Sequence, residues 1–228
     1  MKTFSLVAVL CGSFLASAPA AAAPFFEIGD AGHLPATAQF TAGSGPLTSI
    51  LGNLFDPLDP LGDALDVDLF QIFIFDPAGF SASTVSFPGF YVSDPQLFLF
   101  DAAGVGVFMN DDDPSGLNGA QSALGALPGG LLPGFYSLAI GWWDNEPVDS
   151  LAAYLFDPGA PIDAVVLATS GNPLAGWDGN LLLRPDLETA YEISLTGTAP
   201  AVPEPGAVTL LVAGLAGTLL RRRSRQRR

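Results

Sequence analysis

Apolar residues along the chain gather in short runs separated by turn-forming residues, and few windows between the two ends show a helical period. The strongest run is Leu69-Phe70-Gln71-Ile72-Phe73-Ile74-Phe75, inside an expected strand over 68–76. Other strands are expected over 47–54, 80–87, 96–101, 105–110, 135–142 and 191–196. Closely spaced strands with short connections predict an all-β fold with mainly antiparallel pairing.

The alternation inside these strands predicts which side chains meet. We expect an antiparallel two-sheet β-sandwich of jelly-roll-like type, in which one face of each strand is buried between the sheets. The continuous apolar runs indicate that the other face is covered as well, in part by the segment 144–188. Residues 101–104 (Asp-Ala-Ala-Gly) predict a tight hairpin. In the expected phase, one core holds Phe70, Ile72, Ile74, Leu97, Leu99, Leu138 and Ile140.

The N-terminus has the pattern of a cleavable signal peptide, which we expect over residues 1–22 as a signal helix. Lys2 precedes an apolar run over 4–15, and small residues over 16–23 offer several cleavage registers. About 12 apolar residues are short against the ~20 that a spanning helix needs, which disfavours an uncleaved anchor. Cys11 is the only cysteine and lies inside this segment, so the expected mature chain has no disulfide and no cysteine-bound metal.

The C-terminus combines three elements in order. Residues 199–205 are a proline-containing linker that ends in the box Val202, Pro203, Glu204 and Pro205, and an apolar segment follows over 206–220. A basic tail over 221–228 closes the chain, with Arg221, Arg222, Arg223, Arg225, Arg227 and Arg228. A 15-residue helix reaches only about 22 Å and would insert marginally, with its arginines on the cytoplasmic side.

This arrangement resembles the PEP-CTERM sorting signal of Gram-negative bacteria. The resemblance implies export by the general secretion machinery, recognition by a membrane-embedded exosortase, and processing near 203–205. The chain would then occupy the inner membrane only transiently, as a precursor held by the helix 206–220, before it reaches the cell surface or the extracellular matrix. The alternative is an ordinary tail anchor behind a proline-rich linker.

Charge separates the two ends from the region between them. Of 23 acidic residues all but Glu204 fall within 24–202, where Arg184 is the only basic residue, which leaves 21 net negative charges. Nucleic acid is excluded as a natural partner because binding to phosphates requires lysine and arginine. Multivalent cations and neutral or cationic polymers remain plausible partners.

Four motifs between these ends occur in an order that resembles the bacterial pre-peptidase C-terminal (PPC-type) β-sandwich. They are Asp66-Val67-Asp68-Leu69-Phe70, the run 94–104, the loop 110–113, and the strand 133–140. The resemblance covers 47–145 within an expected β-sandwich domain over 24–198. The opening segment 29–39 is similar to the start of PEP-CTERM-tailed members of this group.

The residues offer little for catalysis, and we expect a protein that is not an enzyme. His33 is the only histidine, and no G-x-S-x-G elbow accompanies it. Zinc seldom binds through carboxylates alone. Acidic pairs suit glycoside hydrolysis, yet most of these acids belong to turns, so an exported hydrolase is a distant alternative.

Calcium is the better candidate ligand. Asn110, Asp111, Asp112 and Asp113 place four oxygen-bearing side chains at a strand end, and we expect Asp94 and Asp101 to reach the same end. Some PPC-type domains bind calcium, which the resemblance adds. The spacing does not reproduce the EF-hand loop, and a solvated acidic turn is the alternative.

Three tryptophans, Trp142, Trp143 and Trp177, suggest a surface for stacking on sugars. In a continuing strand Trp142 and Trp143 point to opposite faces, so one is expected in the core and the other exposed.

The function that the sequence favours is a non-enzymatic structural or adhesive component of the cell surface or exopolysaccharide matrix. A carbohydrate-binding module in the same matrix is the alternative.

Overall fold

The computed structural model describes residues 21–43, 45–54, 66–86, 91–125, 130–179 and 189–203, and within these ranges the protein is all-β. One five-stranded sheet contains, in spatial order, β1 (Ala23–Phe26), β4 (Leu47–Asn53), β14 (Ala190–Thr196), β6 (Ser81–Thr84) and β9 (Ala123–Leu124). The larger sheet contains, in spatial order, β12 (Val165–Leu167), β8 (Gly106–Asn110), β7 (Pro95–Asp101), β10 (Gly134–Trp142), β5 (Val67–Ile74) and β15 (Thr198–Pro200).

Short strands complete these two sheets. A further strand, β2 (Gln39–Phe40), pairs with β5. Two small ladders join β11 (Pro147–Val148) to β13 (Gly176–Trp177) and β3 (Ala42–Gly43) to β16 (Val202–Pro203). Strands of two residues are too short to show a period, which is why the apolar pattern does not predict them.

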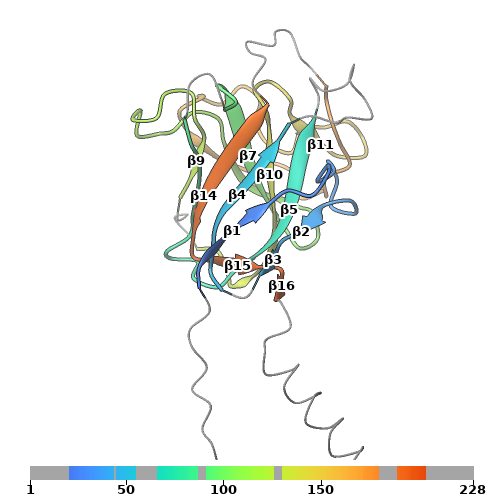
Figure 1. Ribbon diagram of the computed structural model, residues 1–228. Coiled ribbons are helices and arrows are strands. Elements are labelled where there is room, and N and C mark those ends of the chain that lie inside the picture. Colours follow the sequence, from blue (N-terminus) through green and yellow to red (C-terminus); the bar gives the residue numbers. More distant parts are fainter. Residues whose placement is uncertain are drawn as a thin grey trace, which may run out of the picture.

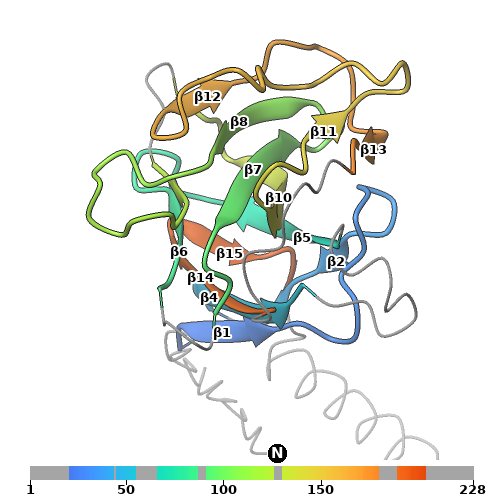
Figure 2. The ribbon, with the colours of Figure 1, turned by 90° about the horizontal axis from the view of Figure 1, so that it is seen from above.

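The main core lies between the two large sheets. Figure 2 shows β1, β4 and β14 on one side of β7 and β10. The predicted phase is confirmed, because all seven side chains expected to share one core lie in a single buried cluster: Phe70, Ile72, Ile74, Leu97, Leu99, Leu138 and Ile140. Partners from the five-stranded sheet include Ile50, Tyr191 and Ile193. The two sheets therefore pack face to face as a sandwich.

The outer face of the larger sheet has a core of its own. Leu69, Phe98 and Phe100, which alternate with the residues of the main core, pack there against Leu155 and Phe156. The segment 144–179, which carries β11, β12 and β13, lies over this face in Figure 2. The described part of the segment expected to cap the outer face thus does so.

Most strand pairs are antiparallel, as expected, but not all. The β7–β8 hairpin is confirmed: Gly104 N donates to Asp101 O at 2.9 Å, and Gly104 takes a φ of +80° that favours glycine. The pairs β1–β4, β2–β5 and β3–β16 are parallel, so the pairing is mainly antiparallel, as predicted, but the sheets are mixed. Each of these pairs joins a short strand through a long excursion of chain rather than through a hairpin.

The end of the domain lies later than expected. The predicted boundary at residue 198 falls in β15, which pairs with β5 through Thr198↔Ile74, and pairing continues to Val202↔Ala42 and Pro203↔Gly43 in β16. The expected linker over 199–205 is therefore, as far as residue 203, part of the folded domain. The chain crosses from one sheet to the other at Gly197, where φ is +68°.

Both ends of the described chain lie at the same end of the sandwich, at the bottom of Figure 1. Ala23 N donates to Pro46 O, and the Thr198 hydroxyl donates to Leu47 O at 2.9 Å. Residues 1–20 of the signal helix expected over 1–22, the residues Glu204 and Pro205, the helix 206–220 and the basic tail 221–228 lie outside the described residues. Among the residues that are described, no helix is long and apolar enough to cross a membrane.

Candidate functional site

The six acidic and amide residues predicted to bind calcium separate into different roles. Asp94 precedes β7 and Asp101 ends it, so the strand holds them apart by about 20 Å at ~3.3 Å per residue. Asp101 instead closes the hairpin: its Oδ1 accepts from Ala103 N at 2.8 Å and from Val105 N at 2.9 Å. The expectation that both aspartates reach the same site is therefore wrong for Asp101.

Asn110 and Asp113 are also committed to structure. The Asn110 amide, fully buried, donates to Asp112 O and Ala164 O, and its Oδ1 accepts from Ala123 N at 2.7 Å. Asp113 accepts from the Ser115 backbone N–H and hydroxyl and from Asn118 Nδ2 at 2.6 Å. Those bonds hold the pKa of Asp113 below its usual value. These two residues shape the loop, with their side-chain oxygens already occupied.

The remaining three aspartates gather at one point. Carboxylate oxygens of Asp94, Asp111 and Asp112 all lie within 4.8 Å of one another. The strand register explains why Asp111 lies here. Asn110 pairs with Leu97, so one step further along this antiparallel pair Asp111 and Gln96 face the outer side of the sheet together. Burial, followed by the charges of Asp94 and Asp112, raises the pKa of Asp111 to about 8.

Two polar residues that the sequence pattern does not identify complete the surroundings of Asp111. Gln96 in β7 donates from Nε2 to Glu146 Oε1 at 3.1 Å, and burial raises the pKa of Glu146 to about 7. Gln96, Asp111 and Glu146 line a cavity of about 140 Å³, together with Trp143, Asp144 and Asp157. Asp111 Oδ1 and Gln96 Oε1 are buried and have no hydrogen-bond partner. We call this cavity and the adjoining Asp94 and Asp112 the acidic pocket.

The three tryptophans do not form one sugar-binding surface. Trp142 is 2% exposed and belongs to the main core, so its predicted role as a sugar contact is wrong. Trp143 is 38% exposed, as the alternation predicts, and lines the acidic pocket. Trp177 packs edge-on against Phe98 at 5.2 Å, and its Nε1 donates to His33 O at 2.8 Å. Sugar contact by Trp143 and Trp177 stays a prediction.

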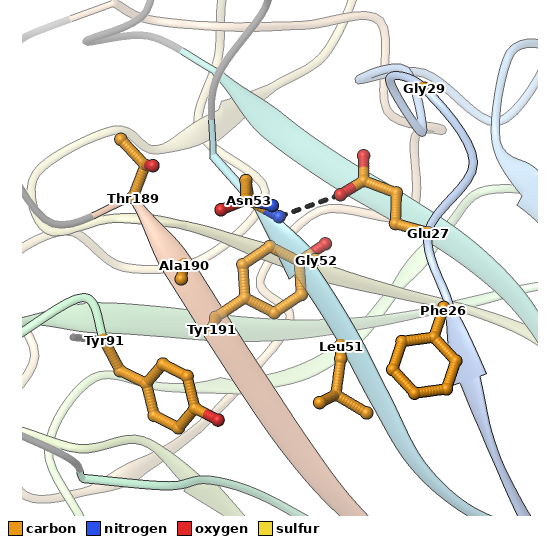
Figure 3. Close-up of a pocket in the computed structure, with 10 residues that line it drawn as sticks. All are labelled: Phe26, Glu27, Gly29, Leu51, Gly52, Asn53, Tyr91, Thr189, Ala190 and Tyr191. Atoms are coloured by element: carbon orange, nitrogen blue, oxygen red, sulfur yellow. Dashed lines mark hydrogen bonds between the residues drawn. The ribbon is translucent and has the colours of Figure 1, made fainter.

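A second polar cluster, absent from the sequence prediction, lies where β1, β4 and β14 run side by side (Figure 3). Asp68, fully buried at the start of β5, accepts from the Tyr191 hydroxyl at 2.6 Å. Glu27 accepts from Ala31 N at 3.0 Å and from Asn53 N at 2.8 Å, and its carboxylate lies within 4.8 Å of that of Asp68. Burial, with the nearby charges of Glu27 and Asp66, raises the pKa of Asp68 well above its usual value. The sequence feature that could have identified this cluster is Asp68 itself, an acidic residue inside the largely apolar strand 67–74.

The surface above this cluster is a groove of about 540 Å³. Figure 3 shows the rings of Phe26 and Tyr91 on either side of Leu51, and Phe26 is 62% exposed. The groove thus combines the exposed ring of Phe26 and the half-buried ring of Tyr91 with the Glu27 carboxylate.

The C-terminal segment leaves the folded domain through β16 at residues 202–203. Residues 201–224 match the family model described as the PEP-CTERM protein-sorting motif. No curated protein and no solved structure matches the chain. The match covers the tail alone and indicates an exported precursor targeted to exosortase. The PPC-type resemblance of the β-domain stays a prediction.

Proposed function

We propose that the β-domain is a non-enzymatic structural or adhesive component of the cell surface or exopolysaccharide matrix, delivered there by exosortase-dependent sorting. The observation that carries the proposal is the sorting motif at 201–224, whose first residues include the last strand of the domain, β16. In this proposal the signal peptide directs export through the inner membrane, and the tail is removed afterwards.

The character of the domain supports a binding or structural role. Several of its described acids are held by turns, as Asp101 and Asp113 illustrate, and His33 is an exposed loop residue. The described ranges contain no lysine or arginine, so the domain surface is polyanionic. Such a surface repels nucleic acid and anionic lipid and suits cations or uncharged polymers.

The test is mass spectrometry of the protein from fractionated cells that express the full-length chain. We expect a surface or secreted form that lacks about the first 20 residues and also lacks Arg221–Arg228, as a signal peptide and a processed tail require. Glu204→Ala, inside the box, should leave unprocessed precursor in the membrane. Asp163→Ala removes an exposed acid from the domain and serves as the matched control, with normal processing expected.

Exosortase dependence is tested in cells that lack the exosortase. The precursor should accumulate there with Arg228 retained. Recovery of only membrane-embedded protein with Arg228 from cells that contain exosortase would show that the proposal is wrong.

The groove in Figure 3 favours carbohydrate binding as a second candidate function. Flat aromatic faces stack on sugar rings, and the carboxylate of Glu27 can accept from sugar hydroxyls. The probe is exopolysaccharide from the producing cells, in affinity electrophoresis. Phe26→Ala and Tyr91→Ala should each abolish retardation, whereas Leu132→Ala, which truncates a 75% exposed apolar residue elsewhere, should not. Equal retardation of all variants would refute this role for the groove.

A further inference from the structure

We propose that the acidic pocket is a binding site for one calcium-class cation, centred on Asp111 and held by oxygen atoms from one end of the β7–β8 ladder, where β7 begins and β8 ends, and from the loop after β10. The inference is independent of the proposed function, since it rests on the folded domain and not on the sorting tail.

The first support is the convergence of oxygen ligands. Carboxylates of Asp94, Asp111 and Asp112 come from two different loops and still lie within 4.8 Å of one another. Oxygens bound to one calcium ion at 2.3–2.6 Å are necessarily at most about 5 Å apart, so the spacing fits. Glu146, from the segment after β10, adds a further carboxylate whose charge reaches Asp111.

The second support is independent of charge. Gln96 is 3% exposed and Asp111 is 6% exposed, and both line the cavity. Gln96 Oε1 and Asp111 Oδ1 have no hydrogen-bond partner, although leaving a buried acceptor unsatisfied costs about 1–3 kcal/mol. Two orphaned oxygens in one cavity, an amide and a carboxylate, are the ligands that a hard cation takes.

The third support is that the described part of the chain supplies no lysine or arginine to balance the charge of these carboxylates. No lysine or arginine occurs in the described ranges, and the Asp111 carboxylate faces those of Asp94, Asp112 and Glu146. A bound cation would offset the mutual repulsion of these carboxylates.

The donor set selects the class of ion. The oxygen atoms that line the pocket belong to carboxylates and an amide, and neither histidine nor cysteine is among its lining residues, which disfavours zinc. The ligands come from separate segments of the chain. Calcium accepts such geometry, whereas magnesium requires a near-ideal octahedron.

The experiment uses the full-length chain in detergent, freed of metal with a chelator and titrated with terbium, whose luminescence is sensitised by a nearby tryptophan. Trp143 lines the pocket, so bound terbium should emit on indole excitation, and Trp143→Phe should remove most of that emission. Calcium should displace terbium with a dissociation constant of about 0.1–1 mM, as in extracellular modules, and magnesium should be at least about tenfold weaker.

Two variants with the same charge change decide the location. Asp111→Asn should weaken calcium binding by about tenfold or more, since the loss of one ligand charge exceeds the ~1.4 kcal/mol that tenfold requires. Asp101→Asn, at the far end of β7, should bind calcium like the unaltered chain. The melting temperature without metal should not fall in Asp111→Asn, because that change removes repulsion; this separates loss of binding from loss of folding.

Three results would overturn the proposal. The first is equal calcium affinity in Asp111→Asn and the unaltered chain. The second is terbium emission that survives Trp143→Phe undiminished. The third is a melting-temperature increase with calcium that sodium chloride reproduces at equal ionic strength.

Discussion

Replacement of Phe70 by alanine tests the central packing of the sandwich. Phe70 lies in β5, is fully buried, and packs edge-on against Phe25 at 6.2 Å and Tyr191 at 6.5 Å between ring centroids. Truncation leaves a cavity enclosed by both sheets, and buried Phe→Ala changes cost about 3–5 kcal/mol. For a domain of this size that lowers the melting temperature by about 6–20 °C.

Phe135→Ala is the matched control, because it removes the same atoms from the larger sheet outside the main core. Phe135 is 50% exposed and contacts Phe73 at 5.1 Å between ring centroids. Half of the transfer free energy of a phenylalanine side chain is about 1 kcal/mol, and no closed cavity forms. The two variants should therefore differ by at least about 2 kcal/mol in the free energy of unfolding.

The assay is urea unfolding of the processed protein, followed by the fluorescence of Trp142, which is buried in the same core. If Phe70→Ala accumulates too poorly, Phe70→Leu should preserve the ranking with a smaller loss. Equal losses in the Phe70 and Phe135 variants would refute the assignment of Phe70 to the core between the sheets.

Three further predictions concern single residues. Because folding raises the pKa of Asp68, the stability of the domain should fall as pH rises from about 4 through the native pKa. In urea midpoints measured across pH, Asp68→Asn should show a smaller fall, and equal pH slopes for both proteins would contradict the prediction. Gly197→Ala should lower the free energy of unfolding by more than the ~1–2 kcal/mol expected from its positive φ alone, since the new Cβ would lie 2.6 Å from Asp76 O. Gly116→Ala, with a similar φ and nothing within 4 Å of the new Cβ, should lose only that amount in thermal melting. Asp113→Ala should lower the free energy of unfolding by about 1–3 kcal/mol and leave the calcium affinity measured by calorimetry unchanged. A loss of calcium affinity as large as that of Asp111→Asn would show that Asp113 is itself a ligand.

The extent to which sequence predicts this fold follows the length of the apolar runs. In β5, β7 and β10 the alternation extends over seven to nine residues, enough to fix which side faces the core. The short strands β2, β3 and β16 are defined by their pairing partners, which lie far away in the chain. Local pattern contains no information about such partners.

The acidic pocket was predictable only in part, for the same reason. Asp111 and Asp112 adjoin in sequence, whereas Asp94 joins them through the β7–β8 register and Glu146 through the loop after β10. Asp101 looked equivalent to Asp94 because both flank the same strand, and the strand length then placed them at opposite ends. Gln96 carried a weak signal, as a polar residue that alternates with the core residue Leu97.

Both ends of the described chain lie at one end of the sandwich, so the two ends of the domain differ in their distance from the tail. β15 pairs with Ile74 at the end of β5, whereas Gln96 of the acidic pocket shares a row with Gly141 and Val67 at its start, seven residues and about 23 Å away. In a precursor still tethered by its tail, this pocket would therefore lie at the end of the domain opposite to β15 and β16. Cation loading then does not have to wait for proteolysis, and the pocket of a tethered molecule is open to a neighbouring surface from the moment of folding.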